Sequence, residues 1–148
     1  MASRTRAQVA FTAYGHPNVR ATHWSTMEVT TQPNLTLKGD CILGVRADKS
    51  PNMVDAAIGW LLRRETSRIT THLSAGEFTE EIRGVGSPRL TLRNASSLVW
   101  RTSNYVDDRT VAIRCDKAAR DVARELVSQL QNPEAVLQVV IVVSAGTT

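Results

Sequence analysis

The densest group of side chains suited to chemistry lies in residues 15–23, which read GHPNVRATH. This stretch holds two imidazoles, His16 and His23, with the amide of Asn18 and the guanidinium of Arg20. Such groups can bind a metal ion, a phosphate or RNA. Zinc needs three or four ligands in a fixed geometry, and the third histidine lies far along the chain, so we expect no metal site. The alternatives are contact with a polyanion and simple hydrogen bonding of the histidines to nearby backbone.

Two Asp-Lys pairs form the other candidate, at Asp48-Lys49 and Asp116-Lys117. Each pair follows an apolar run within an Arg-x-Asp-Lys sequence and precedes a stretch with helical periodicity. A lysine beside a carboxylate can act as a base or as a Schiff-base nucleophile. The simpler interpretation is structural, because an Asp ahead of a helix caps backbone donors and favours the helix N-terminus.

Both pairs belong to a wider internal repeat, which positions every candidate residue. Three anchors recur at similar offsets: Gly15-x-Pro17 and Gly86-x-Pro88, the two Asp-Lys pairs, and Ser74-Ala75-Gly76 and Ser144-Ala145-Gly146. A repeated pattern of this kind indicates duplication of a supersecondary unit. We expect one domain over residues 1–148, with a short basic arm at 1–6 and halves at about 7–76 and 77–146.

Each half shows the same order of predicted elements, β-β-β-α-β. Alternating or apolar runs predict strands at 9–14, 24–30, 41–45 and 68–73, then at 78–83, 97–101, 110–113 and 136–143. Apolar residues at helical spacing predict one helix from Ser50 to Arg64 and a second over 122–130, which ends before Pro133. Trp60 lies near the apolar face and is expected in the core. The fold class is α+β, with two main helices and a mostly antiparallel or mixed sheet, and the halves share one core.

Length and composition bound the class of protein. The 148 residues include 42% hydrophobic and 22% charged residues, as in ordinary globular domains. We expect no membrane contact, because no apolar run reaches the roughly 18 residues that span a bilayer. The absence of a secretory signal pattern predicts a cytoplasmic location. Cys41 and Cys115 are the only cysteines and belong to no Cys-x-x-Cys pair, which favours free thiols.

Positive charge is concentrated in the first half. The chain has 15 Arg and 3 Lys and a net charge of +4; residues 1–76 carry 9 basic against 5 acidic residues, and residues 77–148 carry 9 against 9. A one-sided basic surface is expected where a protein meets a polyanion. The alternative interpretation is an arginine-rich ion-pair surface of a thermophilic protein.

The opening motif resembles a known family. Residues 15–23, with 39–45, 47–49, 109–113 and 116–119, are similar to an archaeal family known as domain-of-unknown-function family 371. The resemblance extends over nearly the whole chain. It implies an archaeal, cytosolic protein, and it supplies no catalytic residues, because the family has no established activity.

The leading functional hypothesis is RNA binding without catalysis, by an accessory protein of the archaeal ribosome. The sequence has no phosphate-binding loop, dinucleotide fingerprint, Gly-x-Ser-x-Gly elbow or His-Glu-x-x-His motif, and no RRM, KH, helix-turn-helix or zinc-finger signature. We expect no catalytic residue, metal, cofactor, membrane or DNA contact; the partners are RNA, expected to be ribosomal, and neighbouring ribosomal proteins. The predicted RNA contacts are Arg4, Arg6, Arg20, Arg63, Arg64, Arg68, His16, Asn18 and His23. The alternative is an enzyme for a small ligand or metal, with a site between the halves built from His16, His23, Asp48, Lys49, Asp116 and Lys117.

Overall fold

The chain forms eight strands, two short α-helices and two 3₁₀ helices. The computed structural model describes residues 4–146. In chain order the elements are β1 (Arg4–Tyr14), β2 (Thr26–Thr30), β3 (Ile42–Gly44), η1 (Pro51–Met53), α1 (Ala56–Leu62), β4 (Arg68–Ala75), β5 (Phe78–Val85), β6 (Ser97–Arg101), β7 (Thr110–Ala112), η2 (Ala119–Asp121), α2 (Arg124–Gln129) and β8 (Val136–Gly146). These elements confirm the predicted α+β class.

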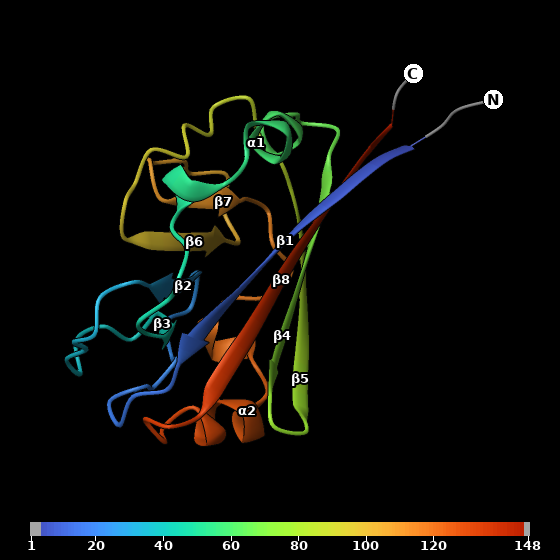
Figure 1. Cartoon of the computed structure of the whole chain (residues 1–148). Coiled ribbons are helices and arrows are strands. Elements are labelled where there is room, and N and C mark those ends of the chain that lie inside the picture. Colours follow the sequence, from blue (N-terminus) through green and yellow to red (C-terminus); the bar gives the residue numbers. More distant parts are fainter. Residues whose placement is uncertain (1–3, 147–148) are drawn as a thin grey trace.

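The strands pair in two sheets of four (Figure 1). Sheet A has the order β1-β8-β4-β5 and is antiparallel throughout. Sheet B has the order β3-β2-β6-β7, with an antiparallel centre and a parallel strand at each edge. Both orders are symmetrical, because each strand of the first half has its counterpart from the second half at the mirrored position. The most apolar strand, β8, is one of the two central strands of sheet A.

Sheet A has one covered face and one open face. Along β4, Ile69, Thr71 and Leu73 are buried, whereas the alternate residues Arg68 and His72 are exposed. This alternation is the period of a strand with one face on the core. Sheet B and both helices lie on the covered side (Figure 1), so the outer face of the sheet meets solvent.

The two sheets share one hydrophobic core. A single cluster of buried residues draws on both sheets and both helices. Trp100 of β6 is fully buried and donates a hydrogen bond from its indole Nε1 to Thr71 Oγ1 of β4, at 2.8 Å. This bond satisfies the two polar groups at the interface between the sheets, where an unpaired donor would destabilise the fold.

The first predicted helix is split. Ser50 precedes the 3₁₀ turn η1, with Pro51 at its first position, and the extended Val54 separates that turn from α1. Ile58, Leu61 and Leu62 face the core. The expectation of a core Trp60 is wrong, because this side chain is 58% exposed: two residues beyond Ile58, it lies on the opposite side of the helix. The α-helices have seven and six residues, and neither is long enough to cross a membrane.

The predicted basic arm is largely a strand. β1 begins at Arg4 and pairs with β8 over its whole length, from Arg4 opposite Gly146 to Tyr14 opposite Val136. Residues 4–6 therefore belong to sheet A, and residues 1–3 lie outside the described part of the chain. The alternation of exposed and buried residues that predicts a strand from residue 9 begins earlier, at Arg6. Because the Arg6 side chain is charged and exposed, the sequence alone suggests a basic arm there and not a strand.

Equivalent positions of the two halves make equivalent hydrogen bonds. The Tyr14 amide donates to the Val45 carbonyl at 2.8 Å, and the Val85 amide donates to the Ile113 carbonyl at 2.9 Å. Arg46 and Arg114, the next residues along, both have positive φ, 54° and 51°. The halves thus repeat the same local geometry, and a common origin by duplication is our interpretation of that repeat.

Candidate nucleic-acid interface

Arginines gather at one end of the outer face of sheet A. Arg6 and Arg68 are opposite the same residue of β8, Ser144, and lie on either side of it. One row further along, Thr70 of β4 is opposite Arg83 of β5. Neighbouring strands are about 4.8 Å apart, so the three guanidinium groups reach one small area of the surface.

This area is hollowed into a groove. A first hollow of about 340 Å³ lies over the sheet face, and a second of about 730 Å³ lies between the start of β4 and the end of β5. A third, of about 460 Å³, continues past Gly86. Neighbouring hollows share lining residues, among them Arg68 and Arg83 for the first two and Arg114 for the last two. We call the three together the arginine groove.

The groove is strongly basic. Its charged lining consists of five arginines and two glutamates: Arg6, Arg68, Arg83, Arg89, Arg114, Glu65 and Glu81. Within the described part of the chain, Arg6, Arg68 and Arg114 make no side-chain hydrogen bond or ion pair. An arginine with a free guanidinium can bind a phosphate through two parallel hydrogen bonds.

The remaining groove arginines are partly engaged. Arg83 forms an ion pair with Glu81 at 2.6 Å, and both side chains are exposed. His72 is also within 3.5 Å of Glu81. Arg89 donates a hydrogen bond to the Asn104 carbonyl at 2.7 Å. Exposed ion pairs contribute little stability, so an anionic ligand can replace Glu81 as the partner of Arg83 at small cost.

The equivalent end of the other half is filled. Arg46 occupies the position that corresponds to Arg114, but its guanidinium lies 4.4 Å from the centre of the Tyr14 ring and donates to the Pro133 carbonyl at 3.0 Å. At the groove, Val85 stands where the other half has Tyr14, and Arg114 therefore has no aromatic ring to pack against. The difference between Tyr14 and Val85 thus separates a packed arginine from an open one.

The loop of residues 102–109, which joins β6 to β7, carries Asn104 in the far wall of the groove. Asp107 anchors this loop, since its carboxylate accepts hydrogen bonds from Arg101 at 2.9 Å and from Arg109 at 2.7 Å. Burial alone would raise the pKa of Asp107, but the hydrogen bonds from Arg109 and Arg101 outweigh it and lower the pKa to about 2. The carboxylate is therefore ionised at neutral pH and holds the groove wall in place.

Comparison with known proteins identifies the family. A family model described as "Domain of unknown function (DUF371)" matches residues 11–144. The chain belongs to this family. An uncharacterized protein of Methanocaldococcus jannaschii, MJ0206, is 36% identical over 131 residues, which are 88% of this chain and 96% of that protein. The matched residues of the DUF371 model include every groove arginine except Arg6.

The predicted contacts of this DUF371 protein separate into distinct groups. Arg6 and Arg68 are brought together in the groove, and the side chain of Arg4 lies outside the described atoms. Arg63 is engaged in the fold, because its guanidinium donates to the carbonyls of Leu90 and Thr91 at 2.9 and 2.8 Å. The guanidinium of Arg64 lies 4.8 Å from the ring centre of Trp60, on α1. The loop residues His16, Asn18, Arg20 and His23 lie elsewhere.

The histidines of the opening motif have a structural task. His23 Nδ1 accepts hydrogen bonds from the amides of Ser25 and Thr26, at 3.2 and 3.1 Å. At the equivalent turn of the other half, Asn94 Oδ1 accepts two backbone hydrogen bonds, at 2.9 and 2.8 Å. The imidazole therefore accepts the backbone hydrogen bonds that an asparagine side chain accepts in an Asx turn.

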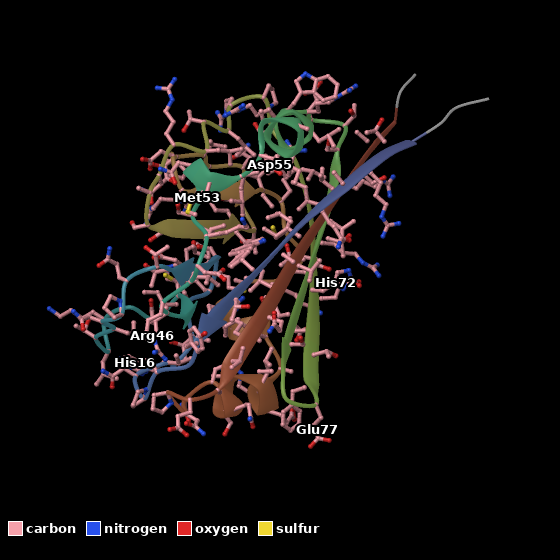
Figure 2. The ribbon with its side chains drawn as sticks, viewed as in Figure 1. His16, Arg46, Met53, Asp55, His72 and Glu77 are labelled. Carbon is pink, nitrogen blue, oxygen red and sulfur yellow. The ribbon has the colours of Figure 1, made fainter. Side chains whose placement is uncertain are left out.

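His16 and Asn18 likewise stabilise their own loop. His16 Nδ1 accepts from the Asn18 amide at 3.0 Å, and the Asn18 side chain donates to the Leu35 carbonyl at 2.8 Å. Figure 2 shows His16 beside Arg46 at the loop end of the molecule, whereas His72 projects from the outer face of sheet A. The motif that dominates the sequence is thus distant from the arginine groove.

The Asp-Lys pairs neither cap helices nor converge. Asp48 Oδ1 accepts from the Thr12 amide at 3.0 Å, and Asp116 Oδ1 accepts from the Arg83 amide at 2.9 Å. They thus hold the two outermost strands of sheet A, β1 and β5, at opposite edges of the sheet. The interpretation of these residues as helix caps is wrong, because the chain runs on from each Asp before its first helical turn begins.

Lys117 has a carboxylate partner, whereas Lys49 has none within residues 4–146. Its Nζ lies 2.5 Å from Glu80 Oε1 and donates to the Glu81 carbonyl at 3.0 Å. Burial tends to raise the pKa of Glu80, but hydrogen bonds from Lys117 and the Ala123 amide lower it overall. The hydrogen bond to Glu80 raises the pKa of Lys117. A lysine held in its charged form is a poor base or nucleophile.

The two cysteine thiols are not activated as nucleophiles. Burial raises the pKa of the Cys115 thiol to about 12, and burial with the charge of Glu28 does the same for Cys41. Both cysteines are free. Among residues 4–146, no three His, Cys, Asp or Glu side chains are grouped closely enough to hold a metal ion. The side chains named for an enzyme between the halves therefore remain dispersed, and the arginine groove is the best candidate site.

Proposed function

We propose that this DUF371 protein binds RNA through the arginine groove. The observation that carries the proposal is the set of three guanidinium groups, Arg6, Arg68 and Arg114, which have no partner among residues 4–146 and lie around adjoining hollows. Guanidinium groups match phosphate oxygens in geometry and in charge. The RNA backbone supplies such phosphates in a row, and the groove supplies cations from β1 and β4, the two strands that flank β8, and from Arg114 just after β7.

The high arginine content has two interpretations, a surface for a polyanion and the ion-pair surface of a thermophilic protein. Whether each arginine has a carboxylate partner distinguishes between them. An ion-pair surface stabilises a fold only when its cations have carboxylate partners. Arg101, Arg109 and Lys117 fit that description, since each has an Asp or Glu within 3 Å. The unpartnered groove arginines do not fit it, and they favour an external anion.

The shape of the site favours RNA over duplex DNA. Recognition of B-DNA commonly places an α-helix in the major groove. Here α1 and α2 are only seven and six residues long and bury one face each against the core. The groove instead lies across an open sheet face and a strand edge, which suits a flexible or irregular polyanion.

The direct test is a binding titration followed by fluorescence anisotropy. Three labelled probes of the same sequence, single-stranded RNA, duplex RNA and duplex DNA, are each titrated with the full chain at low salt. We expect RNA to bind more tightly than duplex DNA, with an affinity that falls steeply as salt rises. No RNA binding at low salt, or equal affinity for duplex DNA, would contradict the proposal.

Association with the ribosome, in the cytoplasm of an archaeon, is the narrower form of the proposal. It rests on the charge of the groove and on the absence of a catalytic arrangement in the described residues. Sedimentation of a native lysate at low and at high salt tests it. We expect the protein in the ribosomal fractions at low salt and in the light fractions at high salt. A protein found only in light fractions at low salt would contradict ribosome association. RNA binding itself is tested separately, by the anisotropy titration.

A further inference from the structure

Trp60 is an exposed aromatic side chain on the helix that leads into the arginine groove. It lies on the outer side of α1, is 58% exposed, and has the Arg64 guanidinium 4.8 Å from its ring centre. Arg64 is followed directly by Glu65 and Thr66, which line two of the three hollows. The aromatic residue and the groove are therefore joined by one continuous stretch of chain.

Hydrogen bonds fix the end of α1 to the groove wall. Ser67 Oγ donates to the Leu61 carbonyl at 2.6 Å, and the Ser87 amide donates to the Leu62 carbonyl at 3.1 Å. Gly86 permits this approach, because a Cβ atom there would lie only 2.3 Å from the Leu62 carbonyl oxygen. Ser67 and Ser87 both line the groove. The helix that carries the indole is thus held at a fixed place relative to the arginine groove.

The other half lacks this aromatic residue. By the offset that relates Ile58 to Leu126 and Leu62 to Leu130, the counterpart of Trp60 is the exposed Ser128 of α2. A serine therefore suffices to build the equivalent helix, and folding does not require an indole at this position. Trp60 therefore occurs on the helix that leads into the groove, and α2 has no aromatic residue at the equivalent position.

We propose that Trp60 is a stacking platform for an unpaired base of single-stranded RNA whose backbone lies in the arginine groove. This inference rests on the proposed function. A cationic groove combined with an exposed aromatic ring is the arrangement that binds single strands. Arg64 packs against the indole and keeps it oriented, and a base can stack on the ring because every base has a π-face. A base inside a duplex has no such face free.

The test compares Trp60→Ser with Trp24→Ser as the matched control. Trp24 is 68% exposed and lies next to His23, outside the groove lining, so both variants lose one surface indole. The probes are a uridine oligonucleotide and an RNA duplex of equal length. We expect Trp60→Ser to weaken binding of the oligonucleotide about ten-fold, to leave duplex binding and the slope of log affinity against log salt unchanged, and Trp24→Ser to change neither.

Fluorescence provides a second measurement that requires no change to Trp60. In a Trp24→Phe variant the two remaining indoles are the exposed Trp60 and the fully buried Trp100. We expect the oligonucleotide to quench the emission and to protect it from iodide, and the duplex to do neither. Full affinity of Trp60→Ser for the oligonucleotide would overturn the stacking proposal and leave RNA binding intact. Failure of the unaltered chain to bind either probe would overturn the proposed function and the stacking proposal together.

Discussion

Arg6 and Arg68 face Ser144 from opposite sides of β8, so two residues 62 positions apart in the chain flank one residue of the sheet, and neither guanidinium has a partner among the described residues. In the proposed site, charge reversal of either residue would remove a phosphate contact and add repulsion. We expect Arg68→Glu to weaken RNA binding by about ten-fold or more at low salt. The control is Arg20→Glu, which makes the same charge change at an exposed arginine outside the groove. Equal losses in the two variants would show that net charge, and not the groove, determines affinity.

Val85→Tyr tests the groove by filling it. The other half has Tyr14 at this position, stacked on Arg46, so the fold accepts a tyrosine there. We expect the new ring to pack against Arg114 and occupy the hollow, with RNA affinity reduced several-fold although no charge has changed. Tyr14→Val, the reciprocal exchange, should leave affinity at or above that of the unaltered chain. Anisotropy titrations measure the RNA affinity of both variants. Unchanged affinity in Val85→Tyr would contradict RNA binding in the part of the groove beside Arg114.

Periodicity and the internal repeat predict most of the fold. The positions of the eight strands follow from alternating and apolar runs, whereas the sequence predicts one antiparallel or mixed sheet and the structure has two. The sequence alone does not reveal that the predicted arm continues as a strand or that α1 is split at Val54. Both depend on tertiary contacts: β1 needs the partner strand β8, and the extended Val54 needs the core beneath it.

The site was harder to predict than the fold. Residue type draws attention to His16 and His23, but the groove arises from strand register, which places Arg6 beside Arg68. A signal for the groove was available in the comparison of halves, since Tyr14 corresponds to Val85. The same comparison relates His23 to Asn94 and indicates a turn residue. Differences between repeats are informative only when the local geometry shows which of them opens a surface.

His23→Asn is expected to be nearly neutral for stability and for RNA binding. Asn94 accepts the same pair of backbone hydrogen bonds in the other half, so asparagine can replace the imidazole. His23→Ala leaves the amides of Ser25 and Thr26 without their acceptor and should lower the free energy of unfolding by about 1–2 kcal/mol. Urea denaturation measures both variants. A loss of RNA affinity in a stably folded His23→Asn would instead restore the histidine to the binding site.

The lowered pKa of Asp107 predicts how the stability of the fold changes at acidic pH. Its folded-state pKa of about 2 lies below the ordinary value of 3.8. The stability it contributes is therefore fully present above pH 4 and is lost as the pH falls from about 4 to about 2. The linkage amounts to about 2 kcal/mol. We expect Asp107→Asn to be less stable than the unaltered chain at pH 7 and to lose less further stability between pH 4 and pH 2. Parallel pH profiles of the two proteins would contradict this assignment.

The most direct measurement of the central claim is the salt dependence of RNA affinity in the Arg6→Gln/Arg68→Gln double variant. Each phosphate neutralised on a single strand contributes about 0.7 to the slope of log affinity against log salt concentration. Titrations between about 50 and 200 mM salt should therefore give the unaltered chain a steep slope and the double variant a slope shallower by about 1.4. The same slope in both proteins would show that the phosphates are bound elsewhere and would contradict an RNA site in the arginine groove.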